Sequence, residues 1–487
     1  MTFPSRPARG LALATLAATA VLLGGCSLVP AYERPQVDLA PRWNSYQASP
    51  LGATVPVQSG WWRSFGDPAL SALEGRALRD SPTLAQARAR IEQARGTAQS
   101  AGAALYPTVS LNGTVDRVHN GSGTTAKVGS GSSSNTQSLF AQAGYELDFW
   151  GKNRATGDAA QALAQASVYD ADTVALTLTA SVADTYFQLL SLRERLRLAQ
   201  GIADDAQRLL ALVQSQADLG VASSLQVEQQ RSAAASFAAA LPPLQQQLEQ
   251  NSHLLAVLVG ATPEQFALAD GGVQAVAVPQ PQAGLPASIL QRRPDIRAAE
   301  ARLQGANFDI GVARAAFYPS LALTANAGVT SAALGHLLSS NPILDIGAAL
   351  AQTLFDGGQR QGQLTVSRGR ATELAAAYRG TVLGALQEVE DGLSATVHQR
   401  ELEAAAQDAA SSAQRASTLA EAQYRLGSSD FLNVLTAQRT RAQAQDALLQ
   451  ARLGRLQAAV GLFRTLGGGF DVASDTSFIS SISGVTP

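Results

Sequence analysis

Four stretches of the chain alternate apolar and polar residues with a period of two, the pattern of a β-strand with one apolar face. In the first stretch, Val109, Leu111 and Val115 alternate with polar neighbours. Each stretch has about ten residues, the length of a tilted membrane-spanning strand, although a half-buried soluble sheet gives the same alternation. The four stretches are Thr108 to Val118, Ser138 to Phe149, Ser320 to Thr330 and Leu344 to Leu354.

A very long helical tract follows each pair of predicted strands. At about 1.5 Å per residue, each tract would extend on the order of 100 Å. A glycine turn at Gly220 or Gly427 then leads into a returning helix, so each half of the chain predicts one helical hairpin. The tracts and their returning helices are 153–219 with 223–259, and 359–426 with 430–466.

The second tract carries small and apolar residues at alternating spacings of three and four, as in a coiled-coil seam. Pro242 and Pro243 interrupt the first returning helix and have no counterpart in the second. Because an interior proline removes a backbone hydrogen bond, we predict a kink there. The seam residues are Leu402, Ala405, Ala409, Ser412, Ala416, Leu419, Gln423 and Leu426.

The two halves repeat each other with an offset of roughly 210 residues, which indicates an internal duplication. Leu219, Gly220 and Val221 return as Leu426, Gly427 and Ser428 in the second half. An earlier series, Pro82, Ala87, Ala89, Arg90, Ala94, Tyr106 and Pro107, returns as Pro294, Ala299, Ala301, Arg302, Ala306, Tyr318 and Pro319.

Four strands are too few for a closed barrel, because small barrels need about eight and an open edge in lipid leaves backbone groups unpaired. We therefore expect several copies of the chain to pool their strands. Two copies would give about eight strands and a filled lumen, whereas three would give about twelve and a pore. A trimer is the smallest assembly that both closes and conducts.

The start of the chain has the form of an export signal. Arg6 and Arg9 precede an apolar run from Leu11 to Leu23, which is too short for a stable membrane-spanning helix. The run ends at Cys26, the only cysteine, in a sequence that resembles the lipobox of bacterial lipoproteins. A lone cysteine is otherwise a small buried apolar residue. We predict a signal peptide and lipidation of Cys26, and Ser27 after it resembles the sorting signal for the outer membrane.

Composition and charge do not indicate nucleic-acid binding, a disulfide or a catalytic site. A formal net charge of -2 does not imply a nucleic-acid partner. The rest of the chain shows no other long apolar run, and with Cys26 lipidated no thiol remains for a disulfide. We expect no catalytic residue, metal or cofactor, since the histidines lack metal-ligand spacing and Glu388 and Glu390 fit a solvated helix face. The histidines are His119, His253, His336 and His398.

Four segments of the chain carry a resemblance to a known family: Trp61 to Leu70, Tyr145 to Gly151, Gln291 to Leu303 and Ile310 to Pro319. They resemble the outer-membrane factor family, the TolC-like, NodT-type efflux lipoproteins. The resemblance extends over essentially the whole mature chain. It implies a mainly α-helical trimer whose twelve-stranded transmembrane β-barrel, with four strands per protomer, continues into a periplasmic α-helical barrel.

The resemblance also implies a function, that of the passive exit duct of a tripartite efflux system. Its partners would be an inner-membrane pump and a periplasmic adaptor, which meets the tips of the helical hairpins. A type I secretion exit duct is an alternative within the same class. A non-conducting periplasmic coiled-coil scaffold lipoprotein is a further alternative, but it leaves the four matched strands unexplained.

Two sets of site residues follow from the resemblance. Relatives narrow their periplasmic end with a ring of side chains, often aspartates, and here Asp408 or Gln414 would line that constriction. A plain position in the helix seam explains both residues equally well. The expected adaptor contacts are the tip residues Leu219, Gly220, Val221, Ser223, Arg425, Leu426, Gly427, Ser428 and Asp430.

The expected organisation divides the chain into six parts. Both repeats contain a helix, a strand hairpin and a helical hairpin, at 108–149 and 153–259 in the first and at 320–355 and 359–466 in the second. The six parts are a signal peptide (1–25), a lipidated equatorial segment (26–80), the first repeat (81–260), an equatorial linker (261–290), the second repeat (291–467) and a C-terminal tail (468–487).

Overall fold

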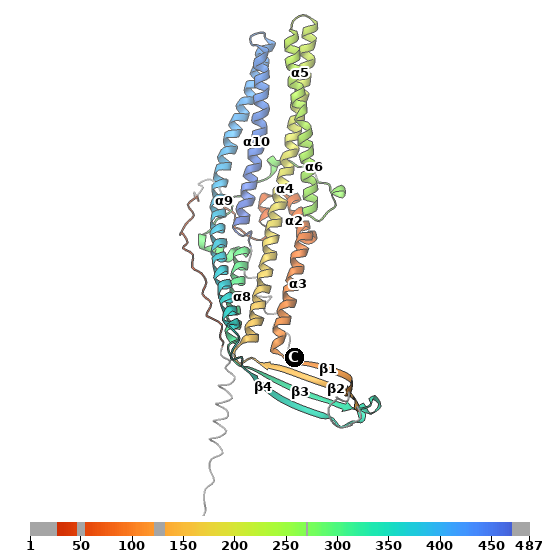
Figure 1. Cartoon of the computed structure of the whole chain (residues 1–487). Helices are drawn as coiled ribbons and strands as arrows, with labels where there is room; N and C mark the ends of the chain where they lie inside the picture. The colour runs from red at the N-terminus through yellow and green to blue at the C-terminus, as the bar shows by residue number, and fades with distance from the viewer. Residues whose placement is uncertain (1–26, 46–53, 121–131, 269–270, 470–487) are drawn as a thin grey trace, which may run out of the picture. The chain divides into compact units, whose positions relative to one another are not determined.

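The part of the chain that the structure describes is mainly α-helical and contains one antiparallel sheet (Figure 1). The computed structural model describes residues 27–45, 54–120, 132–268 and 271–469. These residues form two compact units, and each unit takes segments from both halves of the chain. The first unit contains residues 27–35, 91–167 and 299–378, and the second contains 36–90, 168–298 and 379–469 within the described residues.

The sheet belongs to the first unit and has the strand order β1-β2-β3-β4. Both strand hairpins predicted from the alternation are present, and β2 pairs with β3 to join them (Figure 1). Strands β1 and β4 form the two edges of the four-stranded sheet. The strands are β1 (Thr108–Asn120), β2 (Ser132–Leu147), β3 (Ser320–Ser331) and β4 (Ile343–Ala351).

The register of the sheet gathers the apolar residues on one face. Val109, Ala143, Ala325 and Ile346 are successive partners across the four strands. The neighbouring row, on the opposite face because side chains alternate, contains Ser110, Gln142, Asn326 and Asp345. The alternation seen in the sequence therefore produces one apolar and one polar face.

Strand β2 begins earlier than the sequence predicts, at Ser132 instead of Ser138. The Gly/Ser-rich connection between the first two predicted strands, residues 119–137, is therefore partly strand. Its serines continue the ladder opposite β1, where the Ser133 hydroxyl lies 2.7 Å from the His119 imidazole. Residues 121–131 of this loop lie outside the described residues.

The helices form hairpins of closely matched length in the two halves (Figure 1). Helices α4 and α9 have 67 residues each. The α-helices are α2 (Pro68–Asp80), α3 (Pro82–Gly102), α4 (Lys152–Asp218), α5 (Ser224–Ala239), α6 (Leu241–Leu258), α7 (Ile289–Arg292), α8 (Pro294–Ala315), α9 (Gln359–Arg425) and α10 (Phe431–Thr465). The 3-10 helices are η1 (Trp61–Phe65), η2 (Ala103–Leu105), η3 (Pro263–Gln265), η4 (Val273–Ala275), η5 (Pro286–Ser288) and η6 (Leu334–Ser339).

The interruption predicted at Pro242 and Pro243 is confirmed. The first returning helix is divided into α5 and α6 around Ala240, whereas α10 is continuous over 35 residues. Proline near the first turn of α6 is tolerated because the N–H groups of that turn have no intrahelical partner.

Each returning helix is followed by a left-handed glycine, Gly260 after α6 and Gly467 after α10. A Cβ atom on Gly260 would collide with the backbone carbonyl of Asp80, two residues before Pro82. A Cβ atom on Gly467 would collide in the same way with Arg292, two residues before Pro294. The duplication thus extends to a backbone contact that only glycine permits.

The second unit contains an extensive apolar core, which includes a group of aromatic residues. The Trp61 ring stacks on Phe463 with a centroid distance of 5.1 Å, and Phe65 packs against Phe187 at 5.0 Å. Glu74 of α2 is fully buried within this unit. In the part of the chain that the structure describes, none of the helices is sufficiently long and apolar to cross a membrane.

Candidate functional site

The bends of the two helical hairpins have the same backbone geometry. Gly220 and Gly427 adopt φ values of 75° and 72°. The next residue of each bend donates its N–H back to the helix, Val221 to the Gln216 carbonyl and Ser428 to the Gln423 carbonyl, both at 2.9 Å or less. This is the left-handed glycine termination that closes a helix while satisfying its last carbonyl groups.

The returning helices begin with polar caps. The Ser223 hydroxyl accepts the N–H of Gln226, and the Gln226 side chain accepts the N–H of Ser223, which forms a capping box. On the second tip the Asp430 carboxylate accepts the N–H of Leu432. Both caps satisfy N–H groups that the first helical turn leaves free, and they hold the bends in a defined shape.

Exposed apolar side chains cover both tips. Leu219 and Leu426 are 79% and 82% exposed. Below them, buried residues of both hairpins pack into one cluster, in which the Tyr424 ring lies 5.1 Å from Phe431. The cluster consists of Val213, Val227, Phe431 and Val434. An apolar surface on a rigid base suits contact with another protein.

The remaining tip residues are polar and accessible. The Arg425 guanidinium lies 4.0 Å from Glu421, one helical turn back, and is mostly exposed. The Ser428 hydroxyl donates to the Gln423 carbonyl. Burial, followed by the nearby Asp430 carboxylate, raises the pKa of Tyr424. The structure therefore gathers the predicted tip residues at two bends that share one packed base.

Two ion pairs connect the hairpins below the tips, and the sequence analysis missed both. Arg441 of α10 donates to Asp205 of α4 at 3.0 Å, and Arg195 of α4 donates to Asp446 of α10 at 2.6 Å. The partners are 236 and 251 residues apart in the chain. Neither the helical period nor the internal repeat predicts contacts between residues so far apart in the chain. The sequence therefore carries no signal for these two ion pairs.

The residues predicted for a constriction make separate contacts. Gln414 accepts a hydrogen bond from the Gln445 side chain at 3.0 Å, within the second hairpin. Asp408 is exposed on α9. A role of either residue in a constriction stays a prediction.

Aromatic residues gather where the sheet continues into the long helices of the first unit. Trp150 stacks on Tyr318 with a centroid distance of 4.6 Å and donates its indole N–H to the Pro319 carbonyl at 2.8 Å. Phe355, just after β4, is 88% exposed. Aromatic rings with a polar edge are typical of a membrane–water interface.

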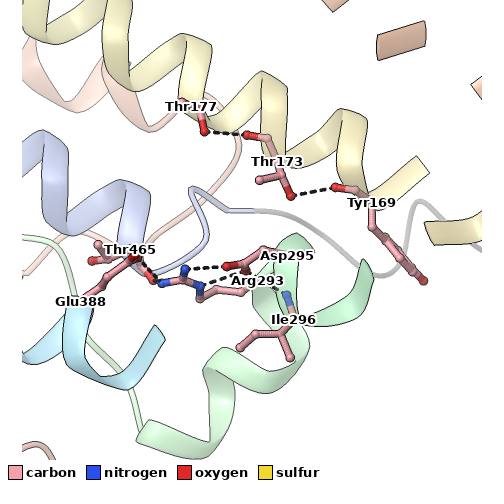
Figure 2. Close-up of polar contacts among 8 residues, drawn as sticks. All are labelled: Tyr169, Thr173, Thr177, Arg293, Asp295, Ile296, Glu388 and Thr465. Atoms are coloured by element: carbon pink, nitrogen blue, oxygen red, sulfur yellow. Dashed lines mark hydrogen bonds and ion pairs between the residues drawn. The ribbon is translucent and has the colours of Figure 1, made fainter. Parts of the chain in front are cut away.

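The Arg293-Pro294-Asp295 motif has a structural role, which Figure 2 shows. Pro294 opens α8, as predicted. The buried Arg293 guanidinium donates to Asp295, to Glu388 at 2.9 Å and to the Thr465 carbonyl at 3.1 Å. These bonds join the start of α8 to α9 and to the end of α10.

Glu388 and Glu390 lie on α9 and are partly exposed, as a solvated face requires, but both also have partners in the protein. Glu388 binds Arg293, and Glu390 accepts the backbone N–H groups of Asn44 and Ser45 at 2.7 and 2.9 Å. A carboxylate on a helix face stays there at low cost when it pairs with donors from a neighbouring segment. Among the described residues, no group of three or more His, Cys, Asp and Glu side chains is arranged to hold a metal.

Comparison with known proteins agrees with this geometry. A family model described as outer membrane efflux protein matches residues 73–261 and 285–468. The pyoverdine export outer membrane protein OpmQ of Pseudomonas aeruginosa is 37% identical over 470 residues, 94% of this chain and 96% of that protein. The probable efflux pump outer membrane protein TtgC of Pseudomonas putida is 34% identical, over 94% of this chain and 96% of its own. The solved outer-membrane channel OprN matches with a TM-score of 0.84 and 27% identity, over 91% of this chain and 100% of its own.

The chain belongs to the outer membrane efflux protein family. This family is a class of outer-membrane channels, not a class of enzymes, and its membership indicates the outer membrane as the location. The resemblance found in the sequence is thereby confirmed.

Proposed function

We propose that the protein is the exit channel of a tripartite efflux system, through which an inner-membrane pump and a periplasmic adaptor pass substrates out of the cell. One observation carries the proposal. The same chain contains two matched strand hairpins in one sheet and two matched helical hairpins with identical bends. Neither a soluble enzyme nor a simple coiled coil needs this combination.

The proposed assembly is a homotrimer. Strands β1 and β4 are edges whose outward N–H and C=O groups need partners, most of all in lipid. Three protomers would join β1 of one copy to β4 of the next and form a barrel of about twelve strands. A heat-resistant trimer in detergent that conducts ions in planar bilayers is the expected result, and a water-soluble elongated monomer would refute the assembly.

The hairpin tips are the proposed adaptor contact. Leu219→Glu and Leu426→Glu change only exposed side chains, so the trimer should form normally while efflux is lost. Bulky residues at Gly220 and Gly427 should have the same effect. Drug susceptibility of cells, together with the amount of heat-resistant trimer, measures both outcomes. Normal efflux in the variants would exclude the tips as the contact.

The proposed constriction has its own test. Gln414→Ala removes the bond to Gln445 and shortens the side chain. Conductance of single channels should rise if Gln414 lines the narrowest point. Unchanged conductance in this variant would remove Gln414 from the constriction, and Asp408→Ala tests the second candidate.

Lipidation of Cys26 is the last part of the proposal, and this residue lies outside the described residues. The apolar run before it and the lipobox-like sequence support the modification. We expect an anchor in the outer membrane from which the protein extends into the periplasm. The intact mass of the purified protein should show a lipid adduct that Cys26→Ser abolishes.

A further inference from the structure

One row of residues on the polar face of the sheet carries two bulky apolar side chains. This row lies two residues away, on each strand, from the row that contains Ser110 and Asp345. Because side chains alternate along a strand, both rows stand on the same face. The members of the row, from β1 to β4, are Asn112, Phe140, Gly328 and Ile343. Two apolar side chains therefore flank a glycine in a surface of mostly small and polar residues.

The Phe140 ring lies across Gly328 of the neighbouring strand. A Cβ atom on Gly328 would stand 2.5 Å from Cδ1 of the ring and would also collide with the Leu139 carbonyl oxygen. The ring thus takes the place that a side chain on Gly328 would fill, as aromatic residues do across a strand glycine. The contact accounts for the partial burial of Phe140.

Ile343 continues this apolar surface onto the edge strand β4. It is the partner of Gly328 and is 40% exposed. Neighbouring strands are about 4.8 Å apart, so the Cα atoms of Phe140 and Ile343 lie about 10 Å apart with Gly328 between them. We name Phe140, Gly328 and Ile343 the apolar patch. Its width suits one aromatic ring that lies on Phe140 and against Ile343.

A carboxylate lies beside the apolar patch. Asp345 is two residues from Ile343 on β4, so both side chains point to the same face, and Asp345 is exposed. Relative to Gly328, Asp345 is a diagonal neighbour at about 7–8 Å. Its Oδ1 accepts a hydrogen bond from the Asn326 amide at 3.4 Å. The carboxylate is therefore accessible to a positive group on a solute that contacts the patch.

The other acidic residues of this face add to its negative charge. Asp116 and Glu146 stand on it by the same alternation, and Glu146 pairs with Lys152 of α4 at 3.4 Å. Among the residues of the four described strands, the only lysine or arginine is Arg117, which the alternation places on the opposite face. The polar face therefore favours cations over anions.

We propose that the apolar patch and Asp345 form a weak binding site for aromatic cations in the channel. The aromatic ring of the solute packs on Phe140 and Ile343, and its positive group pairs with Asp345. Because the site lies open on the sheet, it holds the solute briefly and then releases it, as conduction through a channel requires. The inference rests on the proposed function, in which the polar face lines the lumen of the barrel.

Fluorine NMR on the purified trimer in a neutral detergent measures this binding. The probe is para-fluorophenylpropylammonium, whose propyl chain separates the positive charge from the ring. The matched control ligand is the corresponding alcohol, which has the same ring and chain but no charge. We expect the trimer to broaden the fluorine signal of the ammonium compound more than that of the alcohol, because only the cation pairs with Asp345.

Variants of Phe140 test the aromatic contact. Phe140→Leu keeps an apolar side chain but removes the ring, and it should weaken binding of the cation about fivefold. Phe140→Tyr keeps the ring and should bind the cation as the wild type does. Phe355→Leu is the control, because Phe355 is an exposed aromatic residue that follows β4 and lies outside the apolar patch.

Variants of the carboxylates test the charge. Asp345→Asn should weaken binding of the cation about threefold and leave binding of the alcohol unchanged. Asp116→Asn is the control, since it removes the same charge from the same face. Asp116 is four residues from Asn112 along β1, which puts it farther from the apolar patch than the Debye length of about 8 Å at 0.15 M salt.

The outcomes separate the channel from the site. A wild-type protein that gives no trimer and no conductance refutes the proposed function, and the inference falls with it. A conducting wild-type trimer that broadens both fluorine signals equally overturns the inference alone, as does equal binding by Phe140→Leu and Phe355→Leu. If Phe140→Leu does not assemble, Asp345→Asn decides, and wild-type affinity of that variant for the cation overturns the inference.

Discussion

Gly260 and Gly467 show how a single missing side chain sets the packing of each half. Both glycines have a positive φ, and both lie against a backbone carbonyl that cannot move without shifting the start of α3 or α8. A left-handed backbone alone costs a non-glycine residue about 1–2 kcal/mol, and a collision with backbone adds a cost of the same order. Gly66 has a similar φ but open space around it, so a variant there reports the cost of the left-handed backbone without the collision.

Gly260→Ala and Gly467→Ala should therefore each lower the free energy of unfolding by about 3 kcal/mol, against about 1 kcal/mol for Gly66→Ala. Thermal unfolding followed by helical circular dichroism measures the difference. A Gly66→Ala variant as unstable as the other two would show that the carbonyl contact is unimportant.

Glu74 is a second residue with a measurable effect. Its side chain is buried and has no hydrogen-bond partner among the residues that the structure describes, and burial raises the pKa of the carboxyl from 4.5 to about 9. Between these values the folded protein holds a proton that the unfolded chain releases. Stability should therefore fall as pH rises through this window, by up to about 1.4 kcal/mol per pH unit, and level off above pH 9.

Glu74→Gln removes this titration and should match the wild type at pH 4 while being more stable by about 3 kcal/mol at pH 7. Unfolding by denaturant at several pH values provides the comparison, with Glu249→Gln on the exposed face of α6 as the control. Parallel pH profiles for the wild type and Glu74→Gln would contradict the prediction.

At the scale of elements, the ion pair between Arg441 and Asp205 ties α10 to α4 near the tips. We predict that Arg441→Ala loosens the two hairpins and raises single-channel conductance. Arg208→Ala is the control, because Arg208 binds the same carboxylate from its own helix and is mostly exposed. Exchanging the two charges, with Asp205→Arg and Arg441→Asp, should restore the wild-type conductance. If the exchanged variant keeps the raised conductance, this ion pair does not connect the two hairpins functionally.

The elements were largely predictable from the sequence, whereas their contacts were not. Helix α9 begins at Gln359 as predicted, and β1 begins at Thr108, because period and composition act along the chain. The predicted start of β2, at Ser138, was wrong. Ser132 and its neighbours have little strand preference of their own, and pairing with β1 holds them in the sheet. The tip residues could be predicted through the repeat. Ion pairs such as Arg441 with Asp205 and Arg293 with Glu388 could not, because they depend on which helix faces meet.

At the scale of the whole molecule, the sheet makes the proposed trimer testable through two neighbouring residues. Leu111 lies on the apolar face of β1 and is 71% exposed, and Asn112 lies on the polar face, where it donates to Gln142. A Lys or Arg side chain facing lipid costs about 2–4 kcal/mol near the membrane centre, and a charge facing the lumen costs little.

Leu111→Lys should therefore reduce the amount of membrane-inserted trimer strongly, whereas Asn112→Lys should leave it near the wild-type level. Heat-resistant trimer extracted from outer membranes is the measurement. Equal loss in both variants would mean that the two faces of the sheet do not meet different surroundings.

The break between α5 and α6 gives the two helical hairpins different mechanical properties. Helix α10 is continuous from Phe431 to Thr465. The first hairpin has a joint at Ala240, where α5 ends and α6 begins. In the second hairpin both helices are continuous, and α10 ends beside Arg293. In the first hairpin only α4 is continuous, so we expect its returning helix to bend more easily, at Ala240.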